Sequence, residues 1–339
     1  MTQTVREIYT DQDWDDLVDA ADHATVYHRS GWLAALDATT GAPMRRLVLD
    51  SENGPLALWP IAILRKGPIR VAGSPLPGWN TAYLGPLFLP ACSDKAGAVA
   101  TMMRASPVRR PAFVATRTMD TGVDLSPLGF RKTREFETFE MDLTLPEQAL
   151  WDNLKSTCRT RIRKGEKNGL EVREENDEAY IDSFWQMATE VFAKSNQRPP
   201  YSLAFLRQIE SHLRRRGELL VTSAFLESER VATLIIPHDR TTAMYFAGGS
   251  LASRLDLAPN NLLHWKTMLL CKKRGLKRYD FISNRGSPGK FKSTFLPIER
   301  VSCHHWEFSK NQVIDRLKQI YERQLKSRRR IQSGGQAHE

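Results

Sequence analysis

The stretch 276–297 limits the folds open to this chain more than any other, because it joins a strand pattern to a dense turn signal. Residues 279–282 (Tyr-Asp-Phe-Ile) favour a strand. Residues 284–289 (Asn-Arg-Gly-Ser-Pro-Gly) are typical of a turn, and Lys290 and Lys292 follow it. A strand that ends in a glycine-rich loop can present backbone N–H groups and ammonium charge to an anion. The alternative is a solvated basic loop after an edge strand.

The composition is that of an ordinary globular protein. The 339 residues are 41% hydrophobic and 26% charged, enough for two domains. No apolar run reaches the roughly 18 residues of a membrane span, and residues 1–17 lack the apolar segment of a secretory signal. The 4 cysteines are scattered without zinc-binding spacing. We therefore predict no metal site, reduced thiols and a cytoplasmic location.

The positive charge is concentrated in the second part of the chain. The net charge is +10, but residues 1–140 carry 15 Lys/Arg against 16 Asp/Glu, whereas residues 141–339 carry 34 against 23. A basic excess of this kind indicates an anionic partner, namely nucleic acid, a phosphorylated cofactor or a membrane surface. A merely soluble basic domain is the alternative.

Two parts of the chain repeat one plan: helices, a meander of strands, a helix and closing strands. We predict a first domain over 1–145, a second over 146–328 and a disordered tail over 329–339. The second domain is expected to open with one long helix over 147–168, which Gly169 ends.

The last predicted helix, over 311–328, has an apolar face that we expect to pack against the protein. Its apolar residues are Val313, Ile314, Leu317, Ile320, Tyr321 and Leu325. Basic residues gather at its end, so peripheral contact with an anionic membrane is the alternative. Those basic residues are Lys326, Arg328, Arg329 and Arg330.

Two segments of the second part resemble one protein family. The first is Leu150-Trp151-x-x-Leu154 with Arg159, Ile162-Arg163-Lys164 and Gly169. The second comprises Tyr245-x-x-Gly248 through Pro259, Leu262-Leu263-x-Trp265, Gly275, Tyr279-Asp280-Phe281 and Phe291-Lys292-x-x-Phe295. Together they resemble the FemAB-like branch of the GNAT (Gcn5-related N-acetyltransferase) superfamily, which includes BioF2-like acetyltransferase domains. The resemblance covers roughly 140–300 and is weaker before it.

The resemblance implies an α+β fold with two GNAT-like domains in tandem, each a mixed, mostly antiparallel sheet flanked by helices. It implies transfer of an acyl or aminoacyl group to an amine or hydroxyl, in cell-envelope or polysaccharide metabolism. The donor would be acyl-CoA or aminoacyl-tRNA, with no tightly bound cofactor. The segment 250–259 departs from the family pattern, because it lacks the glycines that most CoA users carry there.

The same resemblance assigns roles near the second domain's closing strand. It makes Lys292 the catalytic candidate and gives Lys290 and Phe291 contacts to the donor. The start of the helix at Asn260 could offer free N–H groups to donor phosphate. Asp280 is a candidate base, with a structural hydrogen bond as the alternative.

Substrate contacts are expected from two other regions. The resemblance implies that Arg198 and Tyr201 contact the acceptor. Tyr245 would either line the substrate channel or lie in the core. The loop 74–86 is rich in glycine and proline, so Trp79 and Tyr83 in it either line a binding cleft or pack at the surface.

A basic cluster on the helix 147–168 suggests a different function. Arg159, Arg163 and Lys164 could guide tRNA or another polyanion, or they could form a solvated basic face. The second hypothesis is therefore a non-catalytic protein that binds RNA or another polyanion on the same fold. The partners that follow from the first are the acyl donor and an envelope precursor or small-molecule acceptor.

Overall fold

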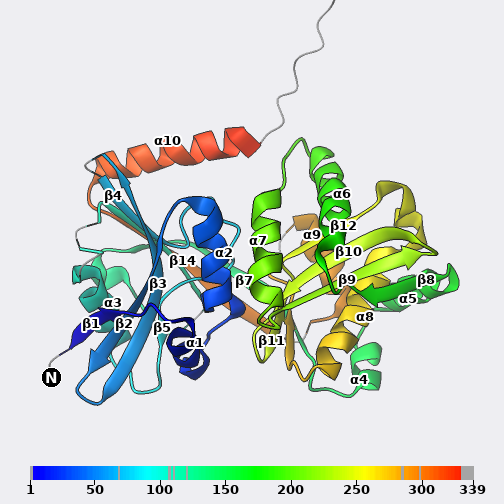
Figure 1. Cartoon of the computed structure of the whole chain (residues 1–339), viewed down its shortest axis with the longest axis horizontal. Helices are drawn as coiled ribbons and strands as arrows, with labels where there is room; N and C mark the ends of the chain where they lie inside the picture. The colour runs from blue at the N-terminus through cyan, green and yellow to red at the C-terminus, as the bar shows by residue number, and fades with distance from the viewer. Residues whose placement is uncertain are drawn as a thin grey trace, which may run out of the picture. The chain divides into compact units, whose positions relative to one another are not determined.

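The computed structural model shows a chain that divides into two compact units (Figure 1). It describes residues 3–67, 69–105, 108–109, 111–119, 121–283, 286–297 and 299–329. The N-terminal unit comprises residues 1–138, 211–213 and 301–320, and the C-terminal unit comprises residues 139–210, 214–300 and 321–339. Residues 301–320, predicted to lie in the second domain, thus join the first unit. The predicted tail falls almost wholly outside the described residues.

The N-terminal unit is built on one sheet with the strand order β1-β2-β3-β4-β6-β14-β7. Its strands are β1 (Thr4–Glu7), β2 (Met44–Ser51), β3 (Gly54–Lys66), β4 (Ile69–Ser74), β6 (Phe113–Met119), β7 (Arg131–Asp142) and β14 (Glu299–Ser309), with β5 (Leu87–Phe88) paired to β3. Strands β4 and β6 pair in parallel, while β1–β2, β2–β3, β3–β4 and β6–β14 are antiparallel. The helices are α1 (Asp11–Ala20), α2 (Ser30–Thr40), α3 (Lys95–Arg104) and the first half of α10 (Gln312–Arg329), whose residues from 321 on are assigned to the C-terminal unit. The short 3₁₀ helices are η1 (Val26–His28) and η2 (Ser126–Leu128).

The C-terminal unit contains two groups of strands. The end of β7 pairs with β13 (Arg278–Asp280), which pairs in parallel with β11 (Thr242–Met244). The second group is antiparallel, in the order β12-β10-β9-β8: β12 (Ala247–Ser250), β10 (Glu229–Pro237), β9 (Leu219–Leu226) and β8 (Leu170–Glu174). The helices are α4 (Glu147–Asp152), α5 (Ser156–Lys167), α6 (Ile181–Ala193), α7 (Leu203–Arg214), α8 (Pro259–Lys273) and α9 (Gly286–Lys292), with 3₁₀ turns η3 (Glu178–Tyr180), η4 (Ala252–Leu257) and η5 (Ser293–Phe295).

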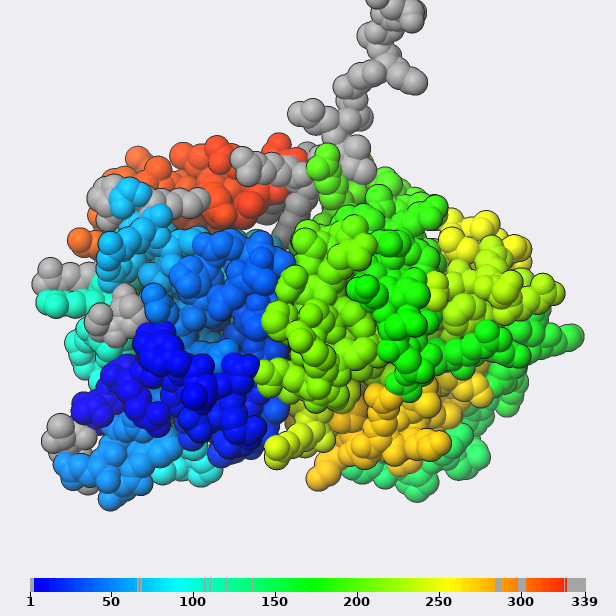
Figure 2. Space-filling model, in the orientation of Figure 1, coloured from blue at the N-terminus to red at the C-terminus, as the bar shows by residue number. Residues whose placement is uncertain are grey.

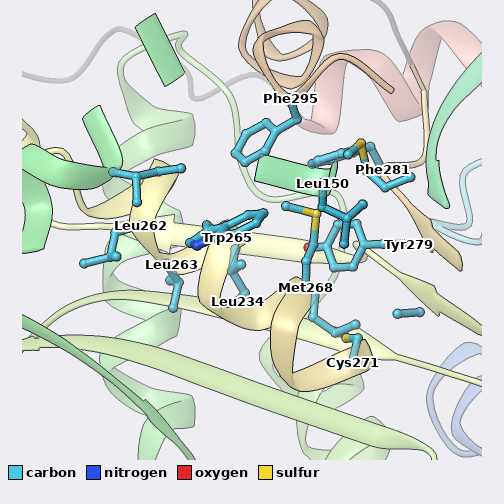
Figure 3. Packing of buried hydrophobic residues seen from close by; sticks show 14 of the residues in the cluster. Leu150, Leu234, Leu262, Leu263, Trp265, Met268, Cys271, Tyr279, Phe281 and Phe295 are labelled. Carbon is cyan, nitrogen blue, oxygen red and sulfur yellow. The ribbon is translucent and has the colours of Figure 1, made fainter. Parts of the chain in front are cut away.

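Helix α8 is the centre of the C-terminal core, as Figure 3 shows. Its apolar side chains are buried on more than one face, as expected of a helix enclosed by other elements. Gly165 of α5 lies against it, because a Cβ atom there would come within 3.1 Å of Leu262. Close packing of α5 on the start of α8 therefore depends on a glycine at this point.

The single helix predicted over 147–168 is wrong, because the chain breaks between α4 and α5. The backbone N–H of Lys155 donates to the carbonyl of Thr294 at 3.0 Å, a partner far away in the sequence. The Arg159 guanidinium donates to the carbonyls of Trp151 and Asp152, at the end of α4, and to that of Leu154. These tertiary bonds satisfy groups that a continuous helix would have used.

Two further expectations differ from the structure. Of the predicted turn 284–289, residues 284 and 285 lie outside the described residues, while 286–292 form the helix α9. Pro288 is in its first turn, where a missing N–H is tolerated. The apolar face predicted for the last helix packs only in part, because Ile314 and Leu325 of α10 are half-buried whereas the other four apolar residues are exposed, namely Val313, Leu317, Ile320 and Tyr321. No helix in the described part of the chain is long and apolar enough to cross a bilayer.

Candidate functional site

The candidate site begins where the chain leaves one group of strands for the other. The backbone N–H of Tyr245, just after β11, donates to the carbonyl of Asp280 at 2.8 Å. The next N–H, that of Phe246, donates to the carbonyl of Ile235 in β10 at 3.2 Å. Tyr245 is therefore hydrogen-bonded to β13, and Phe246, the next residue, is hydrogen-bonded to β10. This split leaves β12 as an edge strand of its sheet.

The Tyr245 side chain folds over β12. A Cβ atom at Gly248 would lie 2.6 Å from the Tyr245 hydroxyl oxygen, closer than any real side chain allows. Gly248 thus makes room for the phenol above the open strand edge. Tyr245 as a whole is half-buried, and burial of its hydroxyl raises the pKa of that group to about 12. At neutral pH the hydroxyl is protonated and can donate a hydrogen bond.

Lys292 is buried under this tyrosine and binds backbone carbonyls. Its side chain is 7% exposed, and Nζ donates to the carbonyls of Phe281 at 2.6 Å, Ile282 at 3.0 Å and Ser283 at 3.2 Å. We call this arrangement the carbonyl clamp. Ile282 and Ser283 have φ values of +50° and +84°, a region that a β-branched residue rarely occupies. The clamp therefore stabilises a strained turn at the end of β13.

Asp280 fixes the same turn from its other side. Its Oδ1 accepts a hydrogen bond from the backbone N–H of Ile282 at 2.6 Å, and the residue is fully buried. This is the structural hydrogen bond that the sequence left open as the alternative to a catalytic base. Burial lowers the pKa of Lys292 to about 8, and the Asp280 charge opposes that shift. Lys292 is therefore mostly charged at neutral pH.

Aromatic rings surround the Lys292 ammonium. Nζ lies 5.3 Å from the Tyr245 ring centre, within range of a cation–π contact. The His264 ring of α8 lies 4.6 Å from Tyr245 and 5.5 Å from Phe291, and its Nδ1 is 3.0 Å from the Tyr279 hydroxyl. Burial, with a further contribution from Lys292, lowers the pKa of His264 to about 3. The site thus holds the Lys292 cation beside the Asp280 carboxylate, among neutral aromatic rings.

The two residues predicted to contact the acceptor, Arg198 and Tyr201, differ in burial. Tyr201 is buried, with its ring 5.4 Å from Phe246 at the strand split and 6.4 Å from Phe184, and burial raises the pKa of its hydroxyl. Arg198 is exposed. The structure therefore brings Tyr201 to the split through Phe246. Within the described part of the chain, no contact joins Arg198 to these groups.

A side-chain hydrogen bond joins the start of α8 to β12. Ala258, at φ +59°, precedes Pro259 and supplies no side-chain cap to the helix. The Asn260 amide donates to the Ser250 hydroxyl at 3.4 Å, which links the helix start to the open strand. Uncapped N–H groups at a helix start attract anions. Most of the segment 250–259, which lacks the glycines of the family pattern, forms the 3₁₀ helix η4.

The remaining predicted residues have other surroundings. Arg159 donates to the carbonyls that end α4, the Arg163 guanidinium stacks 5.3 Å from the Trp151 ring, and Lys164 and Lys290 are exposed. Trp79 and Tyr83 belong to the N-terminal unit. Trp79 is half-buried, while Tyr83 is fully buried, with its ring 6.2 Å from that of Tyr27.

Comparison with known proteins gives the family of this region. Residues 152–291 match the family described as "Acetyltransferase (GNAT) domain". This part of the chain belongs to the GNAT family. The match spans the strand split, α8 and the carbonyl clamp up to Phe291, so all of these features lie within or beside the GNAT domain. No protein with a curated function matches the sequence.

Solved structures extend the likeness to the whole chain. The crystal structure of FemX matches with a TM-score of 0.72 and 13% identity, covering 95% of this chain and 100% of that one. L-PGS from Bacillus licheniformis matches with a TM-score of 0.56 and 12% identity, covering 95% of this chain and 99% of that one. A tandem GNAT protein from the clavulanic acid biosynthesis pathway matches with a TM-score of 0.54 and 11% identity, covering 90% of this chain and 98% of that one. At these identities the likeness shows the fold. The predicted tandem GNAT fold is confirmed.

Sequence reasoning missed three features of the GNAT domain's site. His264 lies on an apolar helix without a partner nearby in sequence, so nothing distinguished it from a core histidine. The segment 243–248 (Ala-Met-Tyr-Phe-Ala-Gly) has the sequence pattern of one continuous strand, which hides the role of Phe246. The carbonyls of the clamp have no sequence signal at all, since any residue can supply them. No group of three metal-binding side chains occurs among the described residues.

Proposed function

We propose that this protein is an acyltransferase that moves an acyl or aminoacyl group from acyl-CoA or aminoacyl-tRNA to an amine or hydroxyl, in cytoplasmic steps of cell-envelope or polysaccharide metabolism. One observation carries the proposal: the strand split sets a protonated phenol, Tyr245, over the open edge of β12 and beside the buried cation of Lys292. The match of residues 152–291 to an acetyltransferase family supports the reaction class.

The donor would lie along β12 and reach the start of α8. An edge strand offers backbone N–H and C=O groups to an extended chain that carries amides, and acyl-CoA carries such a chain. Donor phosphates would meet the uncapped start of α8 near Asn260. This site lacks the usual glycines, so the backbone approach to phosphate would be made by the helix start alone.

Tyr245 would act on the charge that develops during transfer. As the acceptor nitrogen or oxygen bonds to the acyl carbon, the carbonyl oxygen becomes negative, and the hydroxyl of Tyr245 would donate a hydrogen bond to it. The bond from the acyl carbon to the donor sulfur or oxygen then breaks. The proton lost by the acceptor passes to that leaving atom, so this route needs no protein base.

Lys292 would support this step as a positioning residue. All three of its protons have carbonyl acceptors in the clamp, so none is left for the substrate in this arrangement. Its charge, 5.3 Å from the Tyr245 ring centre, still favours a developing oxyanion nearby. Lys292 as a residue that touches the reacting atoms stays a prediction, and the positioning role is the one that we propose.

The non-catalytic alternative has less support from the geometry. Two of the three residues proposed to bind a polyanion are engaged within the unit, Arg159 with carbonyls and Arg163 with Trp151. Binding RNA through them would require those contacts to be exchanged. We therefore retain acyl transfer as the conclusion.

The test is a transfer assay with labelled acetyl-CoA and labelled alanyl-tRNA, each with an amine-bearing nucleotide-linked cell-wall precursor and with amino sugars as acceptors. We expect transfer from one donor, and a thermal shift with that donor alone. Tyr245→Phe keeps the ring and should lower kcat about a hundredfold with little change in donor KM. Lys273→Met, an exposed lysine at the far end of α8, is the matched control.

Two outcomes would contradict the proposal. Transfer by Tyr245→Phe at the wild-type rate would remove the phenol from the chemistry. Salt-sensitive binding of tRNA with no transfer from either donor would favour the non-catalytic alternative.

A further inference from the structure

Helix α10 is attached to the N-terminal unit through its polar side. Asp315 accepts from Arg131 at 2.9 Å and from the Ser309 hydroxyl at 2.6 Å. On the same side, the Lys318 ammonium lies 2.8 Å from the Glu307 carboxylate, and both side chains are largely buried. These ion pairs and hydrogen bonds tie the first half of the helix to β14 and the start of β7. Such a helix would ordinarily pack through its apolar side instead.

The apolar side of α10 faces outward. Val313, Leu317 and Ile320 follow one another at helical spacing and are 62%, 46% and 51% exposed. Figure 2 shows α10, in orange and red, at the surface. Single exposed apolar residues are common, whereas three in register along one helix form a continuous apolar patch. A patch of this kind marks a binding surface.

Two arginines border the apolar residues. Arg316 and Arg323 are exposed and lie seven residues apart, so they share one edge of the helix. Neither forms an ion pair with any described residue. The helix as a whole carries six Lys/Arg against two Asp/Glu. We use "outward stripe" for Val313, Leu317 and Ile320 together with Arg316 and Arg323.

We propose that the outward stripe docks the protein on the surface of a bilayer that contains anionic lipid. An apolar face edged by arginines fits the boundary between acyl chains and headgroups, where the apolar side chains enter and the cations meet phosphate. A second copy of the helix fits less well, because it would bring the same arginines to both sides of the contact.

Docking in this manner has a consequence for substrate choice. A protein held at an anionic leaflet meets acceptors that are themselves anchored to lipid. Lipid binding by the outward stripe can be measured whether or not the protein catalyses the proposed transfer.

The experiment is co-sedimentation of the full chain with vesicles of phosphatidylcholine alone or with about one third phosphatidylglycerol. We expect binding to the anionic vesicles, weakened by high salt. The triple variant Val313→Ser, Leu317→Ser, Ile320→Ser should bind at least tenfold more weakly. The double variant Arg316→Gln, Arg323→Gln should bind about twenty-five-fold more weakly, since each surface cation contributes about fivefold.

Matched controls separate docking from general charge or stickiness. Val191→Ser removes an exposed apolar residue from α6, where Val191 is 40% exposed. Arg65→Gln with Arg104→Gln removes two exposed arginines elsewhere in the N-terminal unit. Both control variants should bind like the wild type. Because the substituted positions are all exposed, every variant should keep the circular dichroism spectrum of the wild type.

A position-specific probe tests the geometry directly. The 4 native cysteines are free and buried, so Leu317→Cys can be labelled selectively with an environment-sensitive fluorophore. Its emission should shift to the blue with anionic vesicles, whereas the same label at Val191→Cys should not respond. Three outcomes would overturn the proposal: no binding to anionic vesicles, equal binding by the triple variant, or a dimer in sedimentation that the triple variant abolishes.

Discussion

Helices α8 and α10 both carry apolar residues, yet their surroundings are opposite. In α8 the residues Leu262, Leu263 and Met268 are buried in the core of the C-terminal unit. In α10 the residues Leu317 and Ile320 are exposed, and polar side chains hold the helix in place. Apolar residues on a helix therefore indicate a surface that favours burial. Whether other parts of the protein bury that surface depends on the tertiary structure.

The largest expected effect that sharpens this comparison is on α8. Leu263 is fully buried within the cluster of Figure 3. Leu263→Ala should lower the free energy of unfolding by about 2–5 kcal/mol, because it removes buried methyl groups and leaves a cavity. Urea unfolding followed by circular dichroism measures the change. A loss below about 1 kcal/mol would show that the core around α8 collapses into the space, and that it is less tightly packed than its burial indicates.

The second effect comes from the charge buried beside α8. The pKa of Lys292 in the folded protein is about 8, below its ordinary value of 10.5. Between these values the unfolded chain binds more protons than the folded one, so raising the pH favours folding. Relative to Lys292→Met, the wild type should gain about 2 kcal/mol of stability between pH 8 and pH 10.

Parallel urea titrations of the two proteins at several pH values measure that difference. The variant serves as the reference, because the other titrating groups are common to both proteins. If the difference stays constant over this range, then Lys292 keeps its ordinary pKa and its burial is not what sets the protonation of the site.

Much of the fold could be predicted because local pattern and tertiary structure agree. The segment Leu219–Leu226 is rich in apolar and β-branched residues, which favours a strand, and the structure has a strand with those bounds. The helix over 147–168 failed where a distant group intervened, since the carbonyl of Thr294 binds the N–H of Lys155. No local property of that segment reports such a partner. The sequence pattern of 243–248 likewise suggests one strand, but Tyr245 and Phe246 bond to different strands.

The site could be located from sequence but its geometry could not. A Phe-Lys pair after the strand at 279–281 drew attention to Lys292, and the structure buries that lysine against the same strand end. Its three acceptors are backbone carbonyls, fixed by positive φ values at Ile282 and Ser283. Sequence does not determine such conformations for residues that rarely adopt them. The tyrosine over the open edge likewise depends on the strand split.

The smallest expected effect tests the other half of the comparison. Leu317→Ala on α10 removes as many atoms as Leu263→Ala on α8, but Leu317 is already 46% exposed. The free energy of unfolding in solution should therefore change by less than about 0.5 kcal/mol, as is usual for surface sites. A loss near that of Leu263→Ala would mean that the protein itself covers the stripe. With anionic vesicles present, the same substitution should weaken lipid binding, because only there does the leucine lose its exposure to water.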